Sequence, residues 1–489
     1  MKNKAKAART VLVALALAAP CAASAHRAAE GDFTLAYQLD AARGKVPRME
    51  TLRRMVDVVA SLGYRQLQMY FKGSFAYAGH EEVWKDVAHF TPAEAKELDA
   101  YCAAKGLELV PYQSTFSHLE PWLALPRYRP LAEAPEAGVT NRWKQVTTAP
   151  MALCPGDPRS MPLLEDILGQ LYPCFRTRLV NVGCDEMIEL DDGGRRSRDA
   201  VARDGVGQVY FDFVMRLHDS VVRNGHVMMF WSDIVRDFPE QVARIPSDAI
   251  ALDWGYEADS PFERTTADLE KAPCRFYVCP GTSSWRSLFG RHANMRANVD
   301  VAWESGRRHG ASGLLLTDWG DNGHCQPWIV SLPALAYAAA KAQGRTPTDA
   351  EIAEKVDGLC GAKVGAALIR LGNAYLRSNA SRRKNVTELF LACLDGRKYR
   401  PGRGVTKADL ETSLAECRAA QKLVDLTGAP AWVRDDMAVV DLLVDVLACR
   451  IAGRHDGLTE RFAGRYRELW NRQYKAEGAE ASLANICGN

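Results

Sequence analysis

Short apolar runs alternate with longer amphipathic stretches from residue 33 to about residue 342. Eight of the runs are short and apolar enough to predict buried strands. They are Phe33–Gln38, Gln66–Tyr70, Leu107–Pro111, Leu179–Val182, Val227–Trp231, Ile250–Trp254, Phe276–Cys279 and Gly313–Thr317. Between and after them, apolar residues recur at the spacing of a helix. The helices predicted in this way are Met49–Ser61, Thr91–Lys105, Met161–Leu171, Gly207–Arg223, Phe262–Lys271, Val299–His309 and Ser331–Ala342.

The order of these elements predicts the fold class. Eight strand–helix units over roughly 300 residues is the count of a (β/α)8 TIM barrel, an α/β fold, whereas a doubly wound sheet rarely needs eight such regular units. Beyond about residue 346 the strand signals vanish, and apolar residues recur at helical spacing, as in Leu410–Leu426 and Met437–Ile451. We therefore expect a barrel over residues 26–345 and an all-α C-terminal domain over residues 346–489.

The first 25 residues have the pattern of a secretory signal peptide. Four basic residues precede the apolar run Val11–Ala19, and Ala23-Ser24-Ala25 supplies the small residues at which a signal peptidase cuts. Cleavage near Ala25 would make His26 the mature start. The sequence therefore predicts a secreted or periplasmic protein.

Composition and charge exclude several classes of function. The formal net charge is only +2, with 25% charged residues, so neither a nucleic-acid partner nor an anionic membrane is indicated. No segment after the leader reaches about 18 uninterrupted apolar residues, which argues against a membrane span. The thirteen cysteines are scattered without metal-ligand spacing. Cys184 reads as a small buried apolar residue.

Polar and aromatic residues follow the predicted strands at their carboxyl ends, where barrel active sites lie. An adjacent carboxylate pair, Asp185 and Glu186, ends the fourth strand after Gly183-Cys184. The other strand ends supply more acids, an arginine, a histidine and four tryptophans. These residues are Asp40, Arg43, Gln113, His118, Trp231, Asp233, Asp253, Trp254, Tyr256, Trp285, Asp318, Trp319 and Asp321.

This set of side chains suits a pyranose ring. The CH faces of a sugar pack on indole rings, and its hydroxyls need charged, directional partners. Glycoside hydrolysis needs an acid for the leaving oxygen and a group that stabilises the oxocarbenium-like centre. Side chains of consecutive residues diverge, which suits one carboxylate under the glycosidic oxygen and the other under a ring substituent. That arrangement is expected where the 2-acetamido group of the substrate is the nucleophile.

On these motifs the chain resembles glycoside hydrolase family 20, the β-N-acetylhexosaminidases, over most of residues 32–330. Val182-Gly183-Cys184-Asp185-Glu186 is similar to the family's His-x-Gly-Gly-Asp-Glu strand, with Asn181 in place of the usual His and Cys184 in place of a Gly. The resemblance implies that Glu186 is the general acid/base. It implies that Asp185 orients the acetamido group and stabilises the oxazolinium ion.

The same resemblance implies binding roles at the other strand ends. Asp40-Ala-Ala-Arg43 is similar to the first-strand motif whose Arg grips the outer hydroxyls of the sugar, and Ser117-His118 stands where the family has Gly-His. Trp319-Gly320-Asp321 is similar to the family's Trp-x-Glu, another hydroxyl contact. The candidates for the walls of an acetamide pocket are Trp231, Trp254 and Trp285, and those for the tyrosine that binds the acetamide are Tyr256 and Tyr277.

The function that this implies is exo-hydrolysis of a terminal β-linked N-acetylhexosamine, without a metal or other cofactor, from a glycan partner. One alternative is a metal-dependent sugar isomerase or epimerase with Glu186, His118 and Asp318 as ligands. Another is a non-catalytic carbohydrate-binding barrel, and a third is a retaining hydrolase with a protein nucleophile. The helical domain either buttresses the barrel or closes the cleft of a partner subunit, as in a homodimer.

Overall fold

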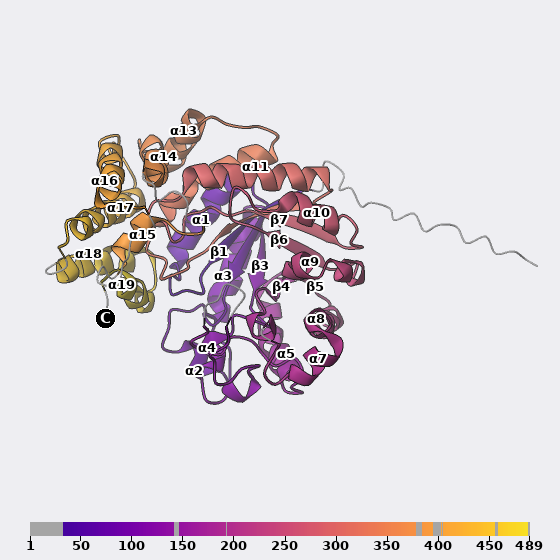
Figure 1. The fold of residues 1–489 in the computed structure, drawn as a ribbon. Coiled ribbons are helices and arrows are strands. Elements are labelled where there is room, and N and C mark those ends of the chain that lie inside the picture. Colours follow the sequence, from indigo (N-terminus) through magenta and orange to yellow (C-terminus); the bar gives the residue numbers. More distant parts are fainter. Residues whose placement is uncertain are drawn as a thin grey trace, which may run out of the picture.

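The protein is a closed barrel of eight parallel strands with a helical region beside it, seen in a computed structural model (Figure 1). The structure describes residues 33–489 except residues 141–145, 192, 378–383, 395–401, 403, 455–457 and 488–489. The predicted signal peptide lies outside the described residues, so secretion stays a prediction. The strands are β1 Thr34–Asp40, β2 Gln66–Tyr70, β3 Glu108–Tyr112, β4 Leu179–Asn181, β5 Val227–Trp231, β6 Ile250–Trp254, β7 Arg275–Cys279 and β8 Gly313–Asp318.

The strands pair in chain order, and β8 closes the barrel on β1 with Leu39 opposite Asp318. This confirms the (β/α)8 fold, and each predicted strand is present within two residues of its expected ends. The helices that cover the barrel as predicted are α1 Met49–Ser61, α3 Pro92–Ala104, α5 Ser160–Leu171, α8 Val206–Arg223, α10 Phe262–Leu269, α11 His292–Arg308 and α12 Leu332–Ala342. Shorter helices in the loops were not predicted: α2 Glu81–Trp84, α4 Glu120–Leu123, α6 Ile188–Asp191, α7 Arg198–Asp204 and α9 Asp233–Asp237.

Helix α11 departs most from its predicted bounds. It begins at His292, seven residues before the predicted start at Val299. Its first two turns bury the polar residues His292 and Asn298, which break the apolar periodicity on which the prediction depended. The side chain of Asn298 donates hydrogen bonds to the carbonyls of Gly255 and Glu257, so tertiary partners compensate for its burial.

Side chains fill the interior of the barrel. Apolar residues such as Val110, Met229 and Leu315 are fully buried there. Gly313 is required beside Tyr277, because a Cβ at residue 313 would lie 2.7 Å from the tyrosine ring. The barrel is therefore a packed core, and only its rim is open to a ligand.

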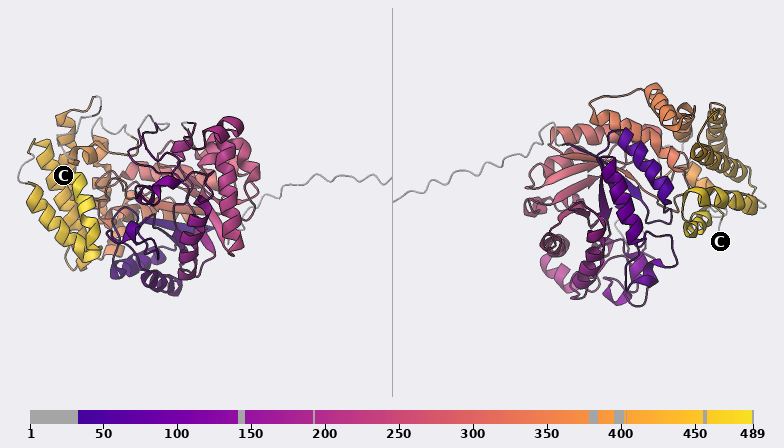
Figure 2. Two further views of the ribbon diagram at one scale, coloured as in Figure 1. Left: turned by 90° about the horizontal axis from the view of Figure 1, so that it is seen from below. Right: turned by 180° about the vertical axis from the view of Figure 1, so that it is seen from behind.

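The region after the barrel is helical, as predicted, and lies against one side of it in the orange-to-yellow part of Figures 1 and 2. Its helices are α13 Asp349–Cys360, α14 Gly365–Asn373, α15 Glu388–Cys393, α16 Lys407–Gln421, α17 Ala431–Ile451, α18 Leu458–Gln473 and α19 Ala479–Cys487. Thr348 caps α13 in a capping box with Glu351, which agrees with a boundary just before it. The division at residue 345 stays a prediction.

A buried lysine joins the two parts. Lys45 follows β1, and its ammonium donates to the carbonyls of His324 and Gln326 and lies 4.7 Å from the ring centre of Tyr474. The backbone N–H of Lys475 donates to Val46. The first βα loop is therefore fixed by the helical region.

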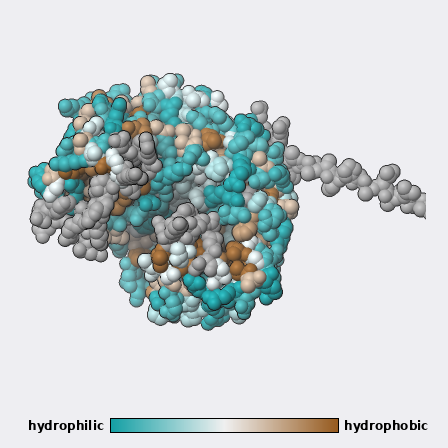
Figure 3. Space-filling view, viewed as in Figure 1, coloured by the Kyte–Doolittle hydropathy of each residue, from teal (hydrophilic) through white to brown (hydrophobic). Residues whose placement is uncertain are grey.

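Most of the surface seen in Figure 3 is polar, with apolar residues in small groups. The exposed large apolar residues of the described chain come from separate segments: Val87, Val146, Val222, Leu376 and Leu423. Within the described residues, no helix has the length and apolar character needed to cross a membrane. The homodimer stays a prediction.

Candidate active site

A pocket opens at the carboxyl ends of the strands, where a TIM barrel places its active site. Loops after β1, β3, β4, β6 and β8 contribute to it, together with the last residues of β2 and β3 and one residue of the helical region. Its lining residues are Arg43, Tyr70, Tyr112, His118, Asp185, Glu186, Trp254, Tyr256, Trp319, Asp321 and Asn385. The structure thus brings together eight of the eleven site residues predicted from the sequence.

The acidic pair stands on an unusually bent backbone. Strand β4 ends at Asn181, and Gly183, Cys184 and Glu186 then have φ angles of +74°, +74° and +53°. Left-handed backbone conformations are costly for residues other than glycine and persist where surrounding contacts hold them. Here Asn181 accepts a hydrogen bond from the Gly183 N–H at 3.0 Å, and Asp233 accepts one from the Glu186 N–H at 2.9 Å. The bend turns both carboxylates toward the pocket.

His118 lies between the two carboxylates. Its Nε2 is 3.2 Å from an Asp185 oxygen and 3.4 Å from a Glu186 oxygen. Burial alone would lower the pKa of His118, but the charges and hydrogen bonds of Asp185 and Glu186 outweigh burial and raise it to about 10. The imidazole is therefore a cation at neutral pH, and it offsets the charge of the acidic pair.

One oxygen of Asp185 is poised for a ligand. Its Oδ2 faces His118, whereas its buried Oδ1 has no hydrogen-bond partner within the described part of the chain. A buried carboxylate oxygen without a donor is costly, and such exceptions call for an explanation. A ligand N–H or O–H entering the pocket would satisfy it.

A second acid supports the pair from behind. Asp233, after β5, accepts hydrogen bonds from the Glu186 N–H and the Trp254 indole. Burial raises the pKa of Asp233 to about 6; the nearby Arg236 lowers it, and the Asp185 carboxylate raises it. Asp233 thus links the strand-four turn to one aromatic wall of the pocket.

A charged cluster forms another part of the pocket lining. Arg43 forms ion pairs with the fully buried Asp40 and, at 3.2 Å, with Asp321. Its guanidinium lies 5.4 Å from the ring centre of Trp319. Asp40 also accepts the Gly320 N–H at 2.9 Å. Asp40 therefore lies behind the lining and fixes both Arg43 and the strand-eight loop.

Aromatic rings form the walls. Trp254 and Tyr256 stack with their ring centres 5.2 Å apart, and the Trp319 indole donates to the Tyr256 hydroxyl at 2.9 Å. On the other side Tyr70 and Tyr112 stack at 4.1 Å. Because the Tyr256 oxygen accepts from Trp319, its own O–H proton can be offered to a ligand.

Other predicted residues lie outside the lining. Trp231 is 1% exposed and donates its indole N–H to the Tyr112 hydroxyl, so it supports the wall from behind. Trp285 is 2% exposed and packs edge-on against Tyr256. Of the two tyrosine candidates, Tyr256 lines the pocket and Tyr277 is buried in the barrel interior.

Asp318 does not join the acidic pair. Its oxygens accept hydrogen bonds from Tyr37, Thr282 and Ser284 at 2.6–2.8 Å. The described part of the chain holds no group of three or more His, Cys, Asp or Glu residues arranged to bind a metal. The ligand set of the isomerase alternative is therefore not assembled here.

Cys184 is buried, and burial raises the pKa of its thiol to about 12. Its sulfur lies 3.6 Å from the Thr115 hydroxyl. A thiol that stays protonated at neutral pH is a poor nucleophile, and its role is packing.

Sequence reasoning missed three lining residues. Tyr70 and Tyr112 are the last residues of β2 and β3. The strand-end rule, which selected the terminal residues Trp231 and Trp254, would have found them had it been applied at the ends of these two strands. Asn385 comes from the helical region, about a hundred residues after the Trp285 indole that contacts it. No local pattern places it in the pocket.

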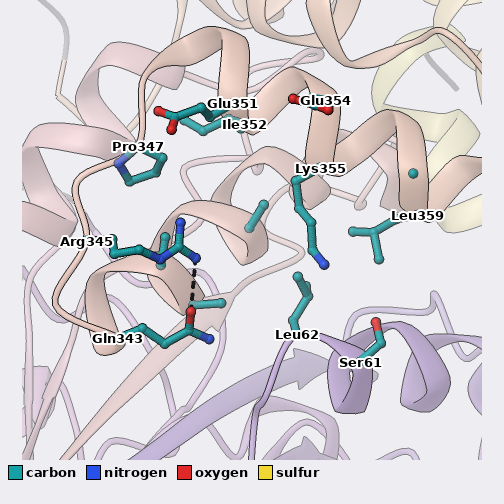
Figure 4. Close-up of a pocket in the computed structure, with 14 residues that line it drawn as sticks. Ser61, Leu62, Gln343, Arg345, Pro347, Glu351, Ile352, Glu354, Lys355 and Leu359 are labelled. Atoms are coloured by element: carbon teal, nitrogen blue, oxygen red, sulfur yellow. Dashed lines mark hydrogen bonds between the residues drawn. The ribbon is translucent and has the colours of Figure 1, made fainter.

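A larger cavity of about 590 Å³ lies at the other end of the barrel, between the ends of α1 and α12 and the helix α13 (Figure 4). Lys355 points into it, and Arg345 donates to Gln343 at its edge. Its carboxylates are not paired with a histidine, and Glu351 is engaged in the cap of α13. The smaller rim pocket is therefore the better candidate for chemistry.

The strand ends of this (β/α)8 barrel hold a carboxylate pair, a histidine cation, an Arg–Asp ion pair and aromatic walls. This combination is typical of a carbohydrate-active enzyme. Residues 38–269 match the model of the glycosyl hydrolase family 20 catalytic domain. Hexosaminidase D of Homo sapiens is 23% identical over 340 residues, which are 65% of this chain and 67% of that protein. Hexosaminidase D of Bos taurus is 24% identical over 318 residues, 60% of this chain and 88% of that protein.

Solved structures agree on the fold. A β-N-acetylhexosaminidase crystal structure has a TM-score of 0.51 at 18% identity and covers 67% of this chain and 74% of its own. The Flavobacterium johnsoniae chitobiase has a TM-score of 0.53 at 14% identity over 92% of this chain and 77% of its own. Residues 38–269 thus resemble a catalytic domain of glycoside hydrolase family 20, and the protein is a glycoside hydrolase similar to the β-N-acetylhexosaminidases.

Proposed function

We propose that the enzyme removes terminal β-linked N-acetylhexosamine, GlcNAc or GalNAc, from the non-reducing end of glycans by substrate-assisted retaining catalysis. The observation that carries the proposal is the adjacent pair at the end of β4: Asp185 has a buried, unpartnered Oδ1, and Glu186 lies beside it in the pocket. One carboxylate can accept the acetamido N–H while the other reaches the glycosidic oxygen. The names of the related proteins, Hexosaminidase D, support the same substrate class.

In the first step the carbonyl oxygen of the acetamido group attacks C1 of the sugar, and the bond from C1 to the glycosidic oxygen breaks. Glu186 gives its proton to the leaving oxygen. Asp185 accepts a hydrogen bond from the acetamido N–H and stabilises the positive charge of the oxazolinium ion. The Tyr256 hydroxyl, already held by the Trp319 indole, donates to the acetamido oxygen and orients it.

In the second step Glu186 takes a proton from water, and the water oxygen bonds to C1 as the bond from C1 to the acetamido oxygen breaks. The two inversions at C1 retain the β configuration. Between the two steps Glu186 is ionised, and the His118 cation then offsets the repulsion between its charge and that of Asp185.

The ion pair between Arg43 and Asp321 supports exo action. The two side chains, 3.2 Å apart, would bind the outer hydroxyls of the terminal sugar. Trp254 and Trp319 supply faces for the ring and its acetamido methyl group.

The test is hydrolysis of the 4-nitrophenyl β-glycosides of GlcNAc, GalNAc, glucose and galactose, with and without a chelator. The variants are Glu186→Gln and Asp185→Asn, and Asp199→Asn on the exposed face of α7 is the matched control. We expect turnover of the two acetamido sugars only, insensitive to chelator. Loss of the general acid or of the acetamide-binding carboxylate should reduce kcat by about 10²- to 10⁴-fold.

A second substrate sharpens the assignment of Glu186. A disaccharide has a poorer leaving group than 4-nitrophenol, so Glu186→Gln should be more harmful on N,N′-diacetylchitobiose. Asp185→Asn should reduce both activities alike. Turnover of glucosides with both variants unaffected would refute the site, and hydrolysis abolished by chelator would refute a mechanism that needs no metal. Sugar binding without any product would indicate a binding-only barrel.

A further inference from the structure

The pocket has one wall residue that does not belong to the barrel. Asn385 lies between η5 (Ala374–Arg377) and α15, yet it lines the same pocket as Asp185 and Glu186. Its φ angle is +55°, a left-handed conformation that Asn tolerates better than most residues. Such a conformation persists when surrounding contacts determine it.

Contacts to the loop after β6 hold this residue in place. The Asn385 N–H donates to Glu257 at 2.7 Å, and Glu257 is itself gripped by both terminal nitrogens of the buried Arg291, at 2.8 and 2.9 Å. The neighbouring Lys384 pairs with Asp259 of the same loop at 2.7 Å. The backbone of Asn385 is thus tied to a buried ion pair of the barrel.

Contacts to the loop after β7 hold it from the other side. The Thr387 N–H donates to the carbonyl of Arg286 at 3.0 Å, and its hydroxyl donates to the carbonyl of Ser287 at 3.3 Å. The Thr387 side chain also caps α15. The segment is therefore part of the rim of the barrel in structural terms, although the chain reaches it only after leaving the barrel.

The Trp285 indole determines how the Asn385 amide is oriented. Trp285 donates its N–H to the Oδ1 of Asn385 at 2.9 Å. An indole can only donate, so the oxygen of the amide must face it and the NH2 group must take the opposite branch. Asn385 lines the pocket and Trp285 does not, which places the NH2 group on the pocket side.

We propose that Asn385 is a specificity-determining residue by which the helical region completes the active site: its Nδ2 donates a hydrogen bond to a hydroxyl oxygen of the bound glycan. Trp285 is the positioning residue that aims this donor. The inference rests on the proposed carbohydrate substrate. The hydroxyl belongs either to the terminal sugar or to the first sugar of the leaving group, and two substrates tell these apart.

The sharpest variant is Asn385→Asp. Aspartate has nearly the same shape, tolerates the left-handed backbone and can still accept from Trp285, but it offers an acceptor where the amide offered a donor. We expect kcat/KM to fall about tenfold, as expected for a lost hydrogen bond. Asn224→Asp, which removes an amide donor at the end of α8, is the matched control and should leave kcat/KM unchanged.

The substrates are 4-nitrophenyl β-GlcNAc and N,N′-diacetylchitobiose. Equal losses on both place the hydrogen bond on the terminal sugar, and a loss on the disaccharide alone places it on the leaving sugar. Trp285→Phe keeps an aromatic side chain but removes the indole N–H together with its five-membered ring, so it should cause a loss on the same substrate. The double variant Asn385→Asp/Trp285→Phe should be no worse than Asn385→Asp, because the two residues act as one unit.

Binding of GlcNAc and of a thiazoline mimic, measured by calorimetry, separates this inference from the proposed function. Weaker binding by Asn385→Asp, with no change in Tm, supports the donor role. If the wild type binds these ligands but shows no turnover, the hydrolase proposal fails and the donor role of Asn385 stands. Unchanged binding and unchanged kcat/KM on both substrates would overturn the inference. A loss of activity that only follows a fall in Tm, or a wild type that binds neither ligand, would overturn it too.

Discussion

Asp253 is a buried acid one residue before Trp254 of the pocket wall, and its replacement by asparagine should stabilise the protein. Asp253 lies in β6, is 3% exposed, and accepts a hydrogen bond from the Thr265 hydroxyl of α10 at 2.6 Å. Burial raises its pKa from 3.8 to about 7, although Thr265 and Arg236 lower it. Asparagine can keep the bond from Thr265 and carries no charge.

The magnitude follows from linkage. A carboxyl whose pKa is raised on folding favours the folded state while it is protonated, and that advantage is lost as pH rises through the folded pKa. Each unit of pKa difference corresponds to about 1.4 kcal/mol, so a shift of about three units costs about 4 kcal/mol above pH 7. At pH 4 the cost is below about 1 kcal/mol, because pH 4 lies close to the pKa of the acid in the unfolded chain and ionisation has only begun to favour the unfolded chain over the folded one.

The assay is urea unfolding followed by tryptophan fluorescence between pH 4 and pH 8. The difference in free energy of unfolding between Asp253→Asn and the wild type should grow by about 3–4 kcal/mol across this range and level off above pH 7. Asp86→Asn, at an exposed carboxylate, is the control. A difference that does not change with pH would show that Asp253 is not a buried acid with a raised pKa.

Three further predictions concern the site, the core and an exposed helix position. His118→Asn should reduce kcat at least tenfold. Because the pKa of His118 is raised to about 10, the imidazole contributes its full stability below pH 6.5 and loses it as pH rises toward 10. The difference in free energy of unfolding between the wild type and this variant should therefore shrink between pH 6.5 and pH 10. Gly313→Ala should lower the free energy of unfolding by about 1–3 kcal/mol, because the new Cβ would lie 2.7 Å from the Tyr277 ring. Gly358→Ala, in open space on α13, should instead raise it by about 0.5–1 kcal/mol in the same denaturation experiment. Equal effects of the two glycine variants would contradict the steric argument.

Much of the site was predictable because a barrel converts position along the chain into position in space. Every strand of a parallel barrel ends at the same rim, so Arg43, Asp185 and Trp319 could be assigned to one pocket although more than 130 residues separate each from the next. The prediction required only the positions of the strands, and runs of apolar residues in the sequence indicate those positions.

The strand-end rule could not predict which side chains point into the pocket. Trp231 and Trp285 stand at strand ends as Trp254 does, yet they lie behind the lining, because their neighbours Tyr112 and Tyr256 take the inner positions. Which of two aromatic residues faces the ligand depends on packing between neighbouring loops. Strand periodicity does not extend into those loops.

The sequence by itself determined the barrel, the helical region after it and the carboxylate pair, because each depends on local pattern: apolar runs, helical spacing and a motif of adjacent residues. Only the tertiary structure decided that His118 is a cation between the two acids, that one oxygen of Asp185 is left for a ligand, and that Asn385 enters the pocket. The physical reason is that charge, burial and hydrogen bonding depend on distances between residues far apart in the chain. No pattern of neighbours along the sequence encodes those distances.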